Sequence, residues 1–153
     1  MRESPITWCN MLLDIGGVKC DDEEVENKFA TLWLLISSGN KFTIEKYIEI
    51  IRQMLMLMKY CSEGSSEIHD VKLTVSDLNK LIDNPLFQYQ KMDLEGIAIY
   101  LDECAKINGK MFCSSITKSK LLARGIDPDE GTITTVKVMP KGTDLQGLIS
   151  SSS

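Results

Sequence analysis

The segment from Ile44 to Cys61 is the feature that most constrains the fold. Its apolar side chains recur at helical spacing and make one wide stripe: Ile44, Tyr47, Ile48, Ile51, Met54, Leu55 and Met58. Ile50 and Leu57 widen that stripe further, and Thr43 stands where a helix N-cap is expected. A helix that is apolar over so much of its surface has to be covered by other elements, so this one is predicted to lie at the centre of the core.

Start and stop signals predict further helices around this central one. Their ranges are about 4–16, 21–39, 74–84, 93–108 and 115–124. Acidic residues fill the first turn of the helix that starts near Asp21, where they complement the helix dipole. Asp93 is predicted to cap the helix at 93–108, and Asn108 and Gly109 are predicted to end it.

Two segments in the C-terminal part favour strands. They are 110–113 and 132–139, and the second is rich in threonine and valine. Because a lone strand is not stable, 132–139 is expected to pair with 110–113 or with a second chain. The predicted fold class is therefore mainly α, a compact bundle of five to six helices with a small C-terminal β element.

Length and composition are those of one globular domain. The chain has 153 residues, of which 43% are hydrophobic and 25% charged. Residues 1–139 are predicted to form a single helical domain with a small α/β end from about residue 108. The segment 140–153, which ends in four serines, is predicted to be a flexible tail.

The cysteine count favours a reducing compartment. Cysteine occurs at 9, 20, 61, 104 and 113, an odd number without the tight spacing of a disulfide framework. These thiols are therefore expected to pack as small hydrophobic groups. The first residues lack the pattern of a signal peptide, and the longest apolar runs are too short to span a bilayer. A cytoplasmic protein without membrane contact is predicted.

No catalytic, metal or cofactor constellation is complete in the sequence. His69 is the only histidine, and no cysteine pair has the spacing of zinc ligands. Glycine-rich phosphate loops are missing, and neighbouring acids such as Asp102 and Glu103 diverge on a helix. The sequence therefore predicts a non-enzymatic interaction or regulatory protein that needs neither cofactor nor metal.

The clearest charge asymmetry is a basic segment at 106–124, which holds five cations and no acid. Opposite in charge is the acidic stretch 14–26. Segregated charge of this kind steers partners toward one side of a fold. The predicted partner-binding residues are Lys110, Lys118, Lys120 and Arg124. The expected partner is another protein or a second copy of the chain, and the edge of the strand at 132–139 is a further candidate contact.

An alternative function is nucleic-acid binding through the same basic segment. Residues 115–127 resemble the first helix and turn of the helix-turn-helix family, which implies a DNA- or RNA-binding module. The sequence pI of about 4.9 argues against this alternative, because general nucleic-acid binders are basic. The many isoleucines, lysines, methionines and serines resemble the composition of small viral accessory proteins, which adds that origin as a hypothesis.

Overall fold

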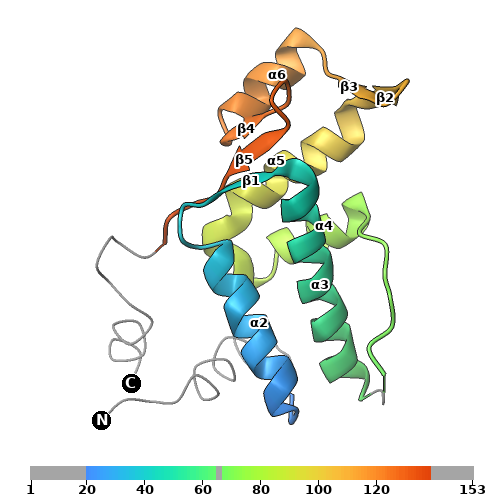
Figure 1. Ribbon diagram of the computed structural model, residues 1–153, viewed down its shortest axis with the longest axis vertical. Helices are drawn as coiled ribbons and strands as arrows, with labels where there is room; N and C mark the ends of the chain where they lie inside the picture. The colour runs from blue at the N-terminus through green and yellow to red at the C-terminus, as the bar shows by residue number, and fades with distance from the viewer. Residues whose placement is uncertain (1–19, 65–66, 139–153) are drawn as a thin grey trace.

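The computed structural model describes residues 20–64 and 67–138 (Figure 1). The helices in these ranges are α2 (Glu23–Leu35), α3 (Ile44–Glu63), α4 (Val75–Ile82), the 3-10 helix η1 (Pro85–Gln90), α5 (Lys91–Glu103) and α6 (Ser115–Leu122). The helix predicted at 4–16 and the tail predicted at 140–153 lie outside the described residues.

Two antiparallel sheets accompany the helices. One has three strands in the order β1-β5-β4, built from Lys41–Thr43, Thr132–Thr134 and Ile126–Asp127. The other is a hairpin of β2 (Ala105–Ile107) and β3 (Lys110–Phe112). The fold is therefore mixed α/β, and the prediction of a compact helical bundle with one small C-terminal β element is wrong.

The three-stranded sheet was missed because its pairing is non-local. β1 is only three residues long and ends at Thr43, whose side chain accepts the N–H of Lys46 and caps α3. The same residues therefore fit a helix-cap pattern, and they form a strand only because the distant β5 pairs with them. Phe42 faces Ile133 in the ladder, so the segment just before α3 pairs with one near the end of the described chain.

The predicted pairing of the two C-terminal strands is also wrong. β3 pairs with β2, and β5 lies between β1 and β4. β5 is shorter than predicted, and beyond it Lys137 makes only an isolated bridge with Ser38. As the middle strand, β5 has no edge open to a partner chain.

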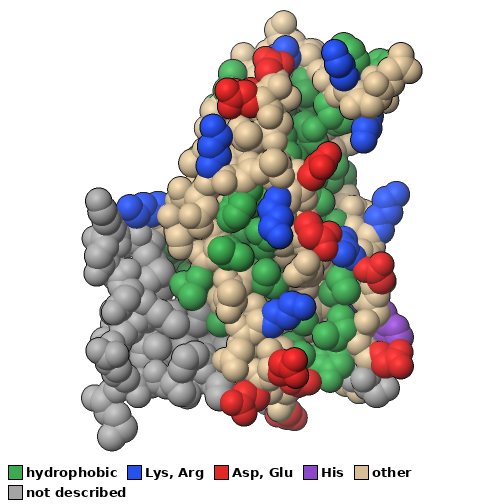
Figure 2. Space-filling model, viewed as in Figure 1, with side chains coloured by type: hydrophobic (Ala, Val, Ile, Leu, Met, Phe, Trp, Pro, Cys, Tyr) green, Lys and Arg blue, Asp and Glu red, His purple; other side chains and the backbone are tan. Residues whose placement is uncertain are grey.

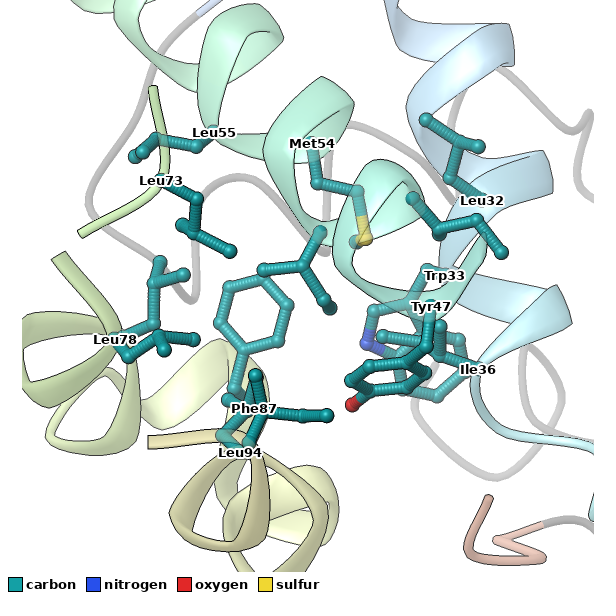
Figure 3. Close-up of a cluster of buried hydrophobic side chains, with 14 of the residues drawn as sticks. Leu32, Trp33, Ile36, Tyr47, Met54, Leu55, Leu73, Leu78, Phe87 and Leu94 are labelled. Carbon is teal, nitrogen blue, oxygen red and sulfur yellow. The ribbon is translucent and has the colours of Figure 1, made fainter. Parts of the chain in front are cut away.

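The prediction that the long apolar helix is central is confirmed. Within α3, Tyr47, Ile51 and Met54 are fully buried. Figure 3 shows side chains of α2, α3 and η1 meeting in this cluster. The indole Nε1 of Trp33 donates to the carbonyl oxygen of Leu86 at 3.3 Å, which joins α2 to η1.

Asp93 does not cap a helix. α5 begins at Lys91, directly after η1, so Asp93 lies inside its first turn and is 1% exposed. Its Oδ2 accepts the backbone N–H of Val136 at 3.0 Å. This carboxyl group therefore ties the segment after β5 to α5.

Four cysteines are paired. The disulfides are Cys20–Cys61, which joins the start of α2 to the end of α3, and Cys104–Cys113, which closes the base of the hairpin. Their Cα atoms lie 4.9 and 4.6 Å apart. The expectation that these cysteines pack as single thiols is wrong, because the packing of α2 against α3 brings the first pair together and the β2–β3 hairpin brings the second pair together.

Candidate protein-binding surface

β2 replaces the predicted last turn of a helix, and β3 lies where a strand was predicted at 110–113. α5 ends at Glu103, and Cys104 already has extended backbone angles. Asn108 and Gly109 have φ angles of 49° and 81°, the left-handed pair that a two-residue hairpin turn requires. Asn-Gly was interpreted as a helix end, although it is the strongest short hairpin signal.

The ladder register separates the hairpin into two faces. Ala105 opposes Phe112 and Ile107 opposes Lys110, so these four side chains share one face. We call this face the hairpin surface. Met111 lies on the other face and packs against the core, on the same side as the Cys104–Cys113 disulfide.

Two large apolar side chains of the hairpin surface point to solvent. Ile107 and Phe112 are each 54% exposed. They occupy diagonal positions of the ladder, where long side chains on one face reach each other. Ile116, in the first turn of α6, is 73% exposed. This end of the molecule, at the upper right of Figure 2, also carries basic side chains.

The hairpin is anchored at its base on both sides. The disulfide ties its two ends together. Glu103, the last residue of α5, accepts the Thr117 hydroxyl at 3.1 Å through Oε1, which joins α5 to α6. Ser114 caps α6 by accepting the N–H of Thr117 at 3.1 Å. The hairpin surface is thus held in place before any partner arrives.

The four predicted partner-binding residues do not form one cluster of free cations. The Nζ of Lys118 lies 3.0 Å from Asp129, and the Nζ of Lys120 lies 3.3 Å from Glu103. Arg124 donates through Nη1 to the carbonyl oxygen of Lys120 at 2.9 Å. Only Lys110 lies on the hairpin, and it forms no ion pair with another described residue.

The structure does not contain a helix-turn-helix module at residues 115–127. After α6 the chain turns at Gly125 and enters β4, which pairs with β5. No second helix follows α6 within residues 123–138. The recognition helix that such a module places in the major groove is therefore missing from this part of the chain.

The described residues contain neither a free cysteine nor a group of three potential metal ligands. Their four cysteines are all in disulfides, so none is a free thiolate nucleophile. His69 is exposed, and no group of three or more potential metal ligands occurs in 20–64 or 67–138.

Comparison with known proteins adds no relative. No family model matches the chain, and neither a curated protein nor a solved structure matches it. Within the ranges that the structure describes, none of the helices combines the length and hydropathy of a membrane-spanning segment.

Sequence reasoning missed Ile107 and Phe112 as site residues. Ile107 lies in the last turn of the helix predicted at 93–108, and Phe112 lies in the strand predicted at 110–113, where a single apolar residue does not indicate a binding site. The signal that identifies them is the Asn108-Gly109 turn, because its two-residue loop fixes the register and hence the face of each flanking side chain.

Proposed function

We propose that this protein is a non-enzymatic interaction protein that binds a protein partner through the hairpin surface. The observation that carries the proposal is the exposure of Ile107 and Phe112 on an anchored hairpin. Large apolar anchors supply much of the affinity of protein interfaces. Holding them rigid before binding lowers the entropy cost of association. Lys110 adds a charge that selects acidic surroundings in the partner.

Nucleic-acid binding remains the alternative, with weaker support. Lys118 and Lys120 already neutralise carboxylates of this chain, so neither is a free charge for phosphate. A regulatory role and a viral origin rest on composition alone. A cytoplasmic location stays a prediction, and the two cysteine pairs count against it because disulfides persist mainly in oxidising compartments.

A photo-crosslinking amino acid at position 112 of the full chain tests this proposal in cells. We expect a discrete protein adduct, which disappears when Ile107→Asp is added. The same amino acid at exposed Asn79, on α4, is the matched control. Identical adducts from positions 112 and 79 would contradict the proposal.

Retention on heparin across a salt series distinguishes nucleic-acid binding from protein binding. A steep salt dependence that flattens in Lys118→Ala/Lys120→Ala would favour nucleic acid. We expect weak retention that these substitutions leave unchanged.

A further inference from the structure

An open groove lies between the first turn of α2 and the end of α3. Its volume is about 510 Å³, and Val25, Leu57, Tyr60 and Ile68 supply the apolar part of its lining. Ile68 is 42% exposed, so apolar surface there faces solvent. A concave apolar site of this size belongs to the range that accommodates ligands with several large apolar groups.

Acidic side chains dominate the rim of this groove. Asp22, Glu24 and Glu67 line it, against the single cation Lys28. Both carboxylate oxygens of Asp22 already accept hydrogen bonds within the chain: Oδ2 accepts the hydroxyl of Tyr60 at 3.1 Å, and Oδ1 caps α2. The carboxylates of Glu24 and Glu67 make no ion pair with the residues that the structure describes. The rim therefore presents uncompensated negative charge beside an apolar floor.

We propose that the hairpin surface of one copy binds in the acid-rimmed groove of a second copy. This inference rests on the proposed function and names its partner. The two surfaces are complementary: the hairpin brings Ile107 and Phe112, and the groove offers an apolar floor for them. Lys110, on the same face of the hairpin as Ile107 and Phe112, faces the carboxylates of the rim.

The contact is head-to-tail because its two halves lie at opposite ends of the molecule. Figure 1 places the hairpin near the upper end of the longest axis and the start of α2 at the lower end. Figure 2 shows acidic side chains gathered at that lower end. A contact between two different patches leaves one hairpin and one groove free after each addition. Assembly therefore continues into a chain or closes into a ring.

Sedimentation velocity of the full chain over a concentration series tests the inference. At low salt, the average mass of the wild type is expected to rise with protein concentration. At high salt, the mass at each concentration should be lower, because salt screens the charges of the rim. A hairpin variant, Ile107→Asp/Phe112→Ser, and a groove variant, Glu24→Lys/Glu67→Lys, should each associate on the order of tenfold more weakly or worse.

Mixing the two variants gives the decisive result. The intact groove of the hairpin variant accepts the intact hairpin of the groove variant, so a heterodimer forms and grows no further. Its formation also shows that both variants are folded. Glu45→Lys is the matched control, since Glu45 and Glu24 both lie in the first turn of a helix, and it should leave assembly unchanged.

A second variant guards against a hairpin substitution that unfolds the protein. Lys110→Glu changes a single exposed residue of the hairpin surface and should weaken assembly. Combined in one chain with Glu24→Lys/Glu67→Lys, it should restore assembly, because the charges are again opposite.

Three outcomes overturn the inference: unimpaired assembly of the groove variant, a mixture that grows beyond a dimer, or a wild type that stays monomeric at every concentration. In the last case, a crosslink from position 112 to another protein leaves the proposed function standing. If position 112 yields no specific crosslink either, both ideas fail.

Discussion

Asp93 is a buried carboxyl group with one backbone partner. Burial raises its pKa from 3.8 to about 6, and the hydrogen bond from Val136 opposes that rise. The hydroxyl of Tyr47 is also buried, and no hydrogen-bond partner for it occurs among the described residues. Burial, followed by the negative charge of Asp93, raises the pKa of Tyr47 well above its ordinary value. Both shifts reflect polar groups held away from water.

The shift of Asp93 predicts a pH dependence of stability. Because the pKa is higher in the folded state than in the unfolded chain, the folded state binds the proton more tightly. The stability from this proton is full below about pH 4 and is lost as the pH rises through about 6, a change of roughly 3 kcal/mol. Denaturant unfolding of wild type and Asp93→Asn between pH 4 and 7.5 measures it. The wild type should lose stability relative to the variant across that window, and parallel curves would contradict the assignment.

Gly125 is needed for both its backbone conformation and its lack of a side chain. Its φ is 77°, and a Cβ there would lie 2.8 Å from the carbonyl oxygen of Thr134. Gly131 has a similar φ of 72° but open space around its Cα. Gly131→Ala should therefore cost only the left-handed strain, about 1–2 kcal/mol of unfolding free energy. Gly125→Ala should cost clearly more in denaturant unfolding, and equal losses would show that β5 yields without penalty.

At the level of elements, local signals predicted several helix caps and the strands at 110–113 and 132–139, whereas β1, β2, β4 and the pairing of the strands were not predicted. Thr43 caps α3 and Thr74 caps α4, the latter with Asp77 in a reciprocal capping box. A cap is a hydrogen bond between residues two or three positions apart, so its signal is present in the local sequence. β1 forms only by pairing with Thr132–Thr134, which is far along the chain, and the sequence near Lys41–Thr43 gives no signal of that pairing.

The hairpin shows that a local signal can still be misread. Asn108-Gly109 suits both a helix end and a two-residue turn, since both need left-handed backbone. The apolar spacing up to Ala105 favoured the helix, but the chain becomes extended at Cys104. The predicted partner site shares Lys110 with the proposed hairpin surface, but it does not include the two apolar residues that carry the proposal.

At the scale of the whole molecule, the two disulfides cross-link regions of very different size. Cys20–Cys61 has a sequence separation of 41 and ties α2 to α3, whereas Cys104–Cys113 has a separation of 9 and stays within the hairpin region. The sequence did not reveal these pairs, because five cysteines without framework spacing allow many connectivities. Only the packing of α2 against α3 brings the first pair together.

Removal of the longer cross-link should cost more stability. In the chain-entropy view, a disulfide stabilises by restricting the unfolded chain, and the restriction grows with loop length. We expect Cys20→Ser/Cys61→Ser to lower the unfolding free energy by about 4 kcal/mol, and Cys104→Ser/Cys113→Ser by about 2.5 kcal/mol. Denaturant unfolding without reductant measures both losses, in a Cys9→Ser background that prevents exchange with the remaining thiol.

Reductant supplies the control for this comparison. Reductant breaks both disulfides of the parent protein, so its unfolding free energy should fall to or below the value that either variant has without reductant. Under reducing conditions, the difference in unfolding free energy between each variant and the parent should disappear. Alkylation of the unfolded parent without reductant should label no cysteine, since Cys9 is replaced and the other four are paired. Four labelled cysteines would show that the pairs do not form. A larger loss from the hairpin disulfide would instead show that the β2–β3 region, through its contacts with α5 and α6, stabilises the whole fold more than its short loop predicts.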